Sequence, residues 1–157
     1  MSLVEDLLDL TRLRFKRFEL NMDWFCIKDL TKLLENLFRF QIERKGLQFI
    51  IDVSEEAKRH MIFSDQRRIH QVLLNLAANA MKFTFKGFIK ITIAIVEGAV
   101  RFEVQDSGVG IKRESLPNLF KLFGKLQENE DLNKTGCGIG LHVSQEIVTR
   151  MGGLINV

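Results

Sequence analysis

Residues 65–84 place polar side chains along one line of an otherwise apolar helical pattern. At about 100° per residue, five polar residues share one narrow stripe: Arg68, Gln71, Asn75, Asn79 and Lys82. Buried amides without partners cost about 1 to 3 kcal/mol each, so the stripe must meet solvent, backbone or a polar ligand. Two asparagines one turn apart offer carbonyl oxygens suited to a hard cation such as Mg²⁺, and the lysine could meet phosphates that the cation bridges. The other interpretation is a simple solvated face, although such faces more often carry Glu and Lys.

A second candidate group lies in the segment VQDSGVGI, residues 104–111. Gly108 and Gly110 follow Asp106 and let the backbone turn sharply and approach a flat ligand closely. A carboxylate at such a turn can accept a hydrogen bond from an exocyclic amine. The D-x-G-x-G pattern alone predicts equally well a turn that the aspartate side chain caps.

Alternate glycines precede the last predicted helix at Gly136, Gly138 and Gly140, and Leu141 follows them. Successive backbone N–H groups and the helix N-terminus can face phosphate oxygens there. The segment is not a Walker loop, because no G-K-[ST] follows, and it is not a Rossmann G-x-G-x-x-G.

Periodicity predicts the elements that must position these groups. Apolar spacing predicts helices at 27–45, at 65–84 and from the glycine segment to about residue 151. Strands are expected at 47–53, 87–96 and 99–105, the last two joined through Glu97-Gly98 as a hairpin, with a final strand from Leu154. Residues 3–18 have the spacing of an amphipathic helix that needs a partner, and residues 21–25 break that pattern. We expect an α/β two-layer sandwich, a mixed sheet covered on one face by three helices and preceded by this helical stalk.

Composition excludes several classes of function. The net charge of +3 comes from 23 basic and 20 acidic residues spread along the chain, so no nucleic-acid partner is indicated. Cys26 and Cys137 stand far apart without zinc-ligand or disulfide spacing. No apolar run is long enough for direct membrane insertion, so we expect a cytoplasmic location, although a parent protein could be membrane-anchored.

The order of these segments resembles the catalytic ATP-binding domain of sensor histidine kinases. These kinases belong to the Bergerat-fold ATPase group with DNA gyrase, Hsp90 and MutL. Residues 65–84 resemble the family's N box, 106–110 its G1 box, 119–123 its F box and 136–140 its G2 box. The resemblance covers nearly the whole chain.

The resemblance implies ATP and Mg²⁺ as cofactors and a role for each matching residue. Asn79 would ligate Mg²⁺, Asn75 and Lys82 would attend the phosphates as catalytic residues, and Asp106 would bind the adenine amine. The remaining ATP-binding residues would be Gly108, Gly110, Phe120, Phe123, Gly136, Gly138, Gly140 and Leu141. The two phenylalanines would anchor an ATP lid, expected from about residue 125 to 134.

Asn75 separates two kinds of chemistry within this group. Hydrolysing members carry a glutamate at this position that polarises water, whereas asparagine has no usable basicity. We therefore expect transfer of the γ-phosphate to a histidine on a dimerisation helix, in two-component or phosphorelay signal transduction. Two alternatives stay open: a non-catalytic ATP-binding pseudokinase or scaffold module, and an ATP-hydrolysing clamp or chaperone fragment.

The phosphoacceptor motif of the family, H-E-x-x-T/N-P, surrounds none of the three histidines, His60, His70 and His142. We interpret the first two as structural or solvated, while His142 opens a helix where it could approach phosphate. The chain is therefore expected to be a protein-histidine kinase fragment that cannot autophosphorylate alone.

The resemblance also divides the chain and implies its partners. Residues 1–20 would be the C-terminal part of a dimerisation and phosphoacceptor helix without its histidine, and residues 24–157 the ATP-binding domain. Partners would be dimerisation helices of the same or a sister protomer and a response regulator or receiver domain, with a homodimer formed through residues 3–18. Members of the family usually continue beyond the position of Val157 into a turn and another strand. Either the sheet of this chain lacks an edge strand, or the domain is cut at its C-terminus.

Overall fold

A computed structural model describes residues 11, 18–122 and 138–157. The chain divides into two units, residues 21–110 and residues 1–20 with 111–157, and each is described by itself. Most of the predicted stalk, Phe123, Gly136, Cys137 and the lid lie outside the described residues.

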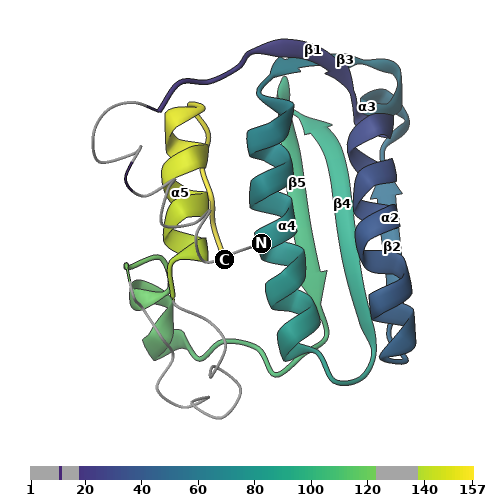
Figure 1. Cartoon of the computed structure of the whole chain (residues 1–157), viewed down its shortest axis with the longest axis vertical. Coiled ribbons are helices and arrows are strands. Elements are labelled where there is room, and N and C mark those ends of the chain that lie inside the picture. Colours follow the sequence, from purple (N-terminus) through teal and green to yellow (C-terminus); the bar gives the residue numbers. More distant parts are fainter. Residues whose placement is uncertain (1–10, 12–17, 123–137) are drawn as a thin grey trace. The chain divides into compact units, whose positions relative to one another are not determined.

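A three-stranded mixed sheet forms the framework of the unit 21–110, with strand order β2-β4-β5 (Figure 1). Strand β2 (Gln48–Val53) pairs in parallel with β4 (Phe88–Val96), which pairs antiparallel with β5 (Ala99–Asp106). The hairpin turn holds Glu97 at φ 52° and Gly98 at φ 79°, two consecutive positive values of the kind that a two-residue hairpin turn requires. The strands predicted at 47–53, 87–96 and 99–105, and the hairpin between the last two, are confirmed.

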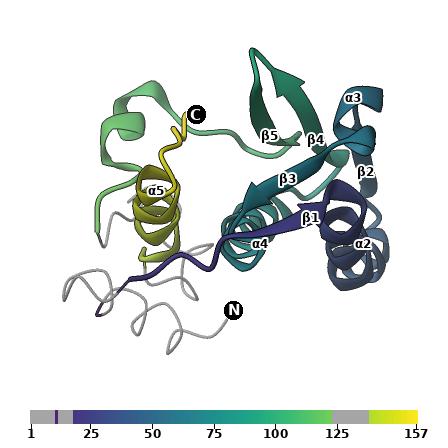
Figure 2. The same cartoon turned by 90° about the horizontal axis from the view of Figure 1, so that it is seen from above.

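Two long helices cover one face of this sheet. Helix α2 (Ile27–Arg44) packs against β2, and α4 (Gln66–Phe83) packs against β4 and β5, side by side with α2 (Figures 1 and 2). Alternate residues of β4 point into this layer and are fully buried: Ile89, Ile91 and Ile93. The helices contribute their apolar stripes, which include Leu30, Leu34, Ile42 and Leu73. The predicted α/β sandwich with a mixed sheet is confirmed.

Three short elements were not predicted. Strand β1 (Asp23–Cys26) pairs antiparallel with β3 (Met61–Ser64), and α3 (Glu55–Arg59) precedes β3. The ring centroids of Trp24 on β1 and Phe63 on β3 lie 5.2 Å apart, and the two ring planes are tilted by 43°. Four residues hold too few alternations to stand out in sequence, and this pairing joins segments far apart in the chain. The expected break at 21–25 is therefore mostly strand.

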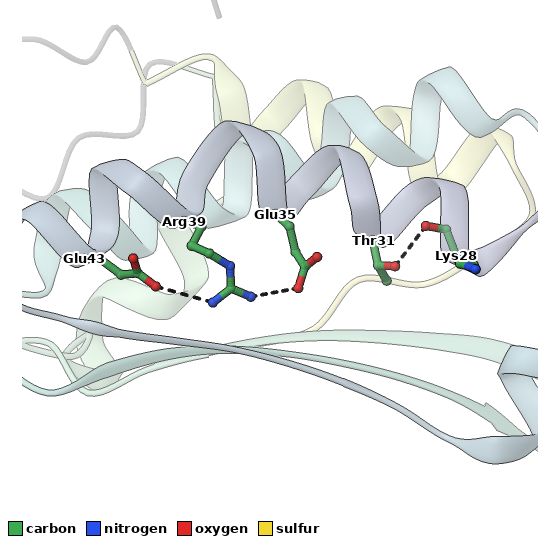
Figure 3. A network of polar contacts seen from close by, with 5 residues as sticks. All are labelled: Lys28, Thr31, Glu35, Arg39 and Glu43. Atoms are coloured by element: carbon green, nitrogen blue, oxygen red, sulfur yellow. Dashed lines mark hydrogen bonds and ion pairs between the residues drawn. The ribbon is translucent and has the colours of Figure 1, made fainter.

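Figure 3 shows the polar side of α2. The guanidinium of Arg39 lies 2.7 Å from a carboxylate oxygen of Glu35 and 3.4 Å from one of Glu43. Its central carbon is 5.7 Å from the ring centroid of Phe49 on β2. The hydrogen bond to Glu35, followed by that to Glu43, raises the pKa of Arg39 above its ordinary value. Exposed pairs of this kind contribute only about 0.3 to 0.5 kcal/mol each, so the buried stripe and not this network holds α2 in place.

The other unit contains a 3₁₀ helix, η1 (Arg113–Asn118), and α5 (Gly140–Arg150). Val143, Ser144 and Ile147 are the buried side of α5. The strand expected from Leu154 was wrong: residues 154–157 form no strand, and Leu154 and Val157 are 82% and 72% exposed. A strand needs backbone hydrogen bonds to a neighbour, and no described residue pairs with this segment.

Candidate functional site

Helix α4 starts at a buried aspartate that serves two parts of the chain. Asp65 is 3% exposed, and its Oδ1 accepts a hydrogen bond from the backbone N–H of Arg68 at 3.0 Å, the geometry of an N-cap. Its Oδ2 accepts a second bond from the N–H of Asn21 at 2.8 Å. Asp65 therefore fixes the start of α4 and the chain that leads into β1.

The predicted polar stripe lies on α4 as one continuous row. Arg68 is buried and donates from Nη1 to Oε1 of Gln71 at 2.7 Å, while Asn75, Asn79 and Lys82 are half-buried. The Nζ of Lys82 lies 4.9 Å from the ring centroid of Phe83. Among the described residues, the side-chain amide of Asn79 makes no hydrogen bond. The stripe is thus neither core nor an ordinary charged face.

The turn after β5 is tied to the last residues of α4. Thr84 Oγ1 donates to Asp106 Oδ1 at 3.2 Å, and the N–H of Gly108 donates to the same oxygen at 2.8 Å. The N–H of Val109 donates to the carbonyl oxygen of Phe83 at 3.3 Å. Asp106 itself is exposed, and Oδ2 accepts no hydrogen bond from the part of the chain that the structure describes. Asp106 therefore caps the turn through Oδ1, while Oδ2 has no bond to a described residue.

Gly108 is required by this close approach. A Cβ there would clash with the carbonyl oxygen of Phe83 and lie 2.7 Å from Asp106 Oδ1. Gly110 has φ +70°, a left-handed conformation that favours glycine, with open space around it. Ser107 locks the other side of the turn, because its Oγ accepts from the N–H of Phe88 at 2.8 Å and donates to the carbonyl oxygen of Lys86 at 3.1 Å.

In the other unit, the start of α5 is joined to the segment after η1. His142 donates from Nδ1 to the carbonyl oxygen of Phe120 at 3.0 Å. Gly138 has φ +69°, and Gly140 and Leu141 begin the helix, where early backbone N–H groups lack partners within the helix itself. The side chain of His142 is therefore engaged in a backbone contact within this unit.

The structure describes the positions of most of the predicted site residues. Asp106, Gly108 and Gly110 form the turn that contacts the end of α4, the helix that carries Asn75, Asn79 and Lys82. Phe120, Gly138, Gly140 and Leu141 lie in the other unit, while Phe123 and Gly136 lie outside the described residues. Two residues that hold the Asp106 turn, Thr84 and Ser107, were not among the predicted site residues.

The other histidines have local backbone partners. His70 Nε2 donates to the carbonyl oxygen of Leu30 at 3.3 Å, and burial lowers the pKa of its imidazole, against the opposing effect of this bond. His60 donates from Nδ1 to the carbonyl oxygen of Glu56 at 2.8 Å on the exposed surface. These contacts agree with a structural or solvated role for both.

Across the described residues, no cluster of three or more His, Cys, Asp or Glu could hold a metal ion. A cation at α4 would therefore depend on an amide oxygen and on oxygens of the ligand itself. Among the described helices, none has both the length and the apolar character to cross a membrane.

Comparison with known proteins matches the segment that contains these features. Residues 64–157 match the family model described as histidine kinase-, DNA gyrase B-, and HSP90-like ATPase. The aerobic respiration control sensor protein ArcB of Escherichia coli (strain K12) is 32% identical over 158 residues, which cover 99% of this chain and 20% of ArcB. The chain thus spans about a fifth of the length of this curated relative.

Solved structures resemble the chain as well. Full-length ShkA in complex with AMPPNP superposes with a TM-score of 0.83 at 31% identity, over 96% of this chain and 31% of that one. Histidine kinase ThkA in complex with the response regulator protein TrrA superposes with a TM-score of 0.71 at 25% identity, over 96% of this chain and 42% of that one. The matched family segment includes α4, the Asp106 turn and α5.

Proposed function

The chain belongs to the histidine kinase-, DNA gyrase B- and HSP90-like ATPase family, and from this membership we propose that it is the catalytic domain of a histidine kinase. It would bind Mg-ATP and transfer the γ-phosphate to a histidine on a dimerisation helix in two-component signalling. The observation that carries the proposal is the pair of hydrogen bonds that Thr84 and Gly108 donate to Asp106 Oδ1. These bonds hold the Asp106 carboxylate at the end of α4, the helix that carries Asn75 and Asn79.

Asp106 would recognise the adenine base. Its Oδ1 is occupied by the two bonds from Thr84 and Gly108, so Oδ2 would accept the hydrogen bond from the exocyclic amine of adenine. Gly108 and Gly110 keep the backbone of the turn free of side chains, which lets a flat base lie close to it. The AMPPNP bound to ShkA, an analogue of ATP, supports a nucleotide ligand for this chain too.

The phosphates of ATP would be bound by residues of α4 and by residues at the start of α5. Asn75 and Lys82 would bind and orient the phosphates from the α4 stripe. The backbone N–H groups near Gly138, Gly140 and Leu141 would bind phosphate oxygens at a helix N-terminus, together with Gly136. Phe120 and Phe123 would anchor the segment that covers the nucleotide.

The residues present fit a magnesium ion at one position. Asn79 is half-buried on the stripe, and its amide oxygen is a hard ligand that makes no bond to described residues. Mg²⁺ held there would neutralise charge on the phosphates. Asn79 would orient the ion, while Lys82, one turn further on, would add positive charge.

Asn75 favours transfer over hydrolysis. An amide cannot accept a proton from water at neutral pH, so this chain places no general base on α4 at the position where hydrolysing relatives carry glutamate. Its residues would hold the γ-phosphate for another nucleophile, with positioning and charge neutralisation as the contribution to rate.

The parts of a complete kinase follow from the same proposal. Residues 1–20 would end the dimerisation helix, residues 24–157 would be the ATP-binding domain, and the acceptor histidine would come from dimerisation helices of the same or a sister protomer. A response regulator or receiver domain would take the phosphoryl group next, and the ThkA complex with TrrA supports a partner of this class. The reaction would take place in the cytoplasm.

The test is transfer in trans. The full chain is incubated with γ-labelled ATP and Mg²⁺, alone and with a dimerisation segment that carries an H-E-x-x-T/N-P motif. We expect acid-labile, base-stable label on the added segment, none on the chain alone, and slow phosphate release. Asn79→Ala should abolish the label. Brisk phosphate release by the chain alone would indicate an ATPase, and tight ATP binding without transfer to several segments would indicate a pseudokinase.

A further inference from the structure

Thr84 is a buried residue whose side-chain hydroxyl bonds to Asp106, the residue proposed to bind the adenine amine. The residue is 0% exposed and ends α4, where its N–H donates to the carbonyl oxygen of Ala80 at 3.0 Å. Its Oγ1 donates to Oδ1 of Asp106, twenty-two residues along the chain, at 3.2 Å. A buried hydroxyl normally needs a partner, and an alanine or valine would cap this helix end as well through the same backbone bond. The helix end therefore does not need the Thr84 hydroxyl, whose hydrogen bond goes to Asp106.

Two donors from different segments converge on a single oxygen of Asp106. The Gly108 N–H reaches Oδ1 at 2.8 Å from the turn itself, while the Thr84 hydroxyl reaches it from the end of α4. One bond would leave the carboxylate free to rotate about its last torsion, whereas two bonds in different directions fix its plane. The plane of the carboxylate sets where Oδ2 points, and Oδ2 is the oxygen that no described residue occupies.

The turn does not depend on Thr84 for its own position. The N–H of Val109 donates to the carbonyl oxygen of Phe83, the N–H of Ser107 donates to the carbonyl oxygen of Phe88 at 3.1 Å, and Asp106 pairs with Ile89 in the sheet. Lys45 Nζ also bonds the carbonyl oxygen of Met81 at 2.8 Å and holds the last turn of α4. Loss of the Thr84 hydroxyl should therefore release the carboxylate and leave the backbone in place.

We propose that Thr84 is a positioning residue that makes the site selective for adenine, because it holds the Asp106 carboxylate with Oδ2 directed at the exocyclic amine. The inference rests on the proposed function and adds a residue that acts through Asp106. It concerns recognition of one amino group and not the general affinity for nucleotides.

The experiment compares ATP with purine riboside triphosphate, which lacks the 6-amino group, by calorimetric titration of the full chain. The unmutated chain should prefer ATP. Thr84→Val, which has the same shape without the hydroxyl, should weaken ATP binding about threefold to tenfold, the worth of one hydrogen bond, and leave binding of the analogue unchanged. Thr84→Ser should restore the preference, and Thr92→Val on β4 should behave as the unmutated chain.

Each result has one meaning. If Thr84→Val weakens both nucleotides equally, or lowers only the melting temperature, Thr84 is a structural helix end and the inference is wrong. If the unmutated chain prefers ATP and Thr84→Val keeps that preference, the inference alone fails. If the unmutated chain binds neither nucleotide, or binds both equally, the proposed role of Asp106 fails first and the inference fails with it.

Discussion

The imidazole Nδ1 of His142 lies 3.0 Å from the backbone carbonyl oxygen of Phe120 and donates a hydrogen bond to it. This bond joins the first turn of α5 to the segment that follows η1, across twenty-two residues of chain. The sequence allowed His142 to approach phosphate, but in the structure its side chain links α5 to the backbone of Phe120.

His142→Ala should therefore destabilise this unit. The half-buried carbonyl oxygen of Phe120 loses its donor, so the free energy of unfolding should fall by about 1 kcal/mol and the melting temperature by about 2 to 4 °C. Thermal unfolding measures both. His60→Ala removes a comparable bond on the exposed surface and should change stability by no more than about 0.5 kcal/mol. Equal melting of the two variants would contradict a structural role for the His142 bond.

Asn79→Ala should remove the dependence of ATP affinity on Mg²⁺. The proposed ligand is a single amide oxygen, so the variant should bind ATP equally well with Mg²⁺ and with a chelator, at the lower affinity of the metal-free state. Calorimetry under both conditions measures this. Asn36→Ala, on the exposed face of α2, is the matched control and should keep the full metal effect. An unmutated chain that ignores Mg²⁺ would show that the metal role is wrong.

Asp106→Asn should weaken adenine nucleotide binding by about 1.5 to 3 kcal/mol, the worth of a hydrogen bond to a charged acceptor. An amide oxygen can still accept from Thr84 and Gly108, but the NH₂ group then faces the adenine amine, donor against donor. The melting temperature should change little. Asp52→Asn, on the sheet surface beside Lys90, is the control for loss of one exposed charge. Unchanged affinity with a large drop in melting temperature would show that Asp106 only caps the turn.

Stability should decrease on the acid side because of His70. Burial lowers its pKa in the folded chain below the ordinary value of 6.5, so the folded state favours the neutral imidazole. The stabilising contribution is complete above pH 6.5 and is lost as the pH falls through the lowered pKa. Urea unfolding between about pH 5 and pH 8 should show this slope, and His70→Gln, which keeps a donor for Leu30, should flatten it. A variant with the full acid slope would exclude His70 as its source.

The sequence predicted the features that depend on neighbours within a few residues. The apolar period over residues 65–84 predicts α4 to within one residue at each end, and Glu97-Gly98 marks the hairpin turn. The stripe from Arg68 to Lys82 follows from helix geometry alone. These features are local, because helix and hairpin bonds join residues close together in the chain.

The functional candidates divide in the same way. Residue types and their order were enough to single out Asn75, Asn79, Lys82 and Asp106, because the spacing of polar groups on a helix and of glycines in a turn can be seen in the sequence. The sequence could not show which atoms of these side chains are already bonded to other parts of the chain. The D-x-G-x-G pattern allowed either a cap or a ligand group, and only the structure shows one carboxylate oxygen in the cap while no described residue occupies the other.

The sequence by itself determined the order of the three longer helices and of strands β2, β4 and β5, the polar stripe and the family resemblance. Tertiary structure alone decided which distant groups meet: β1 with β3, Thr84 with Asp106, and His142 with Phe120. It also decided that residues 154–157 form no strand, since a strand exists only where another segment supplies its hydrogen bonds. Contacts between segments far apart in the sequence form only when the intervening chain folds back and brings them together, so no local pattern of residue types predicts them.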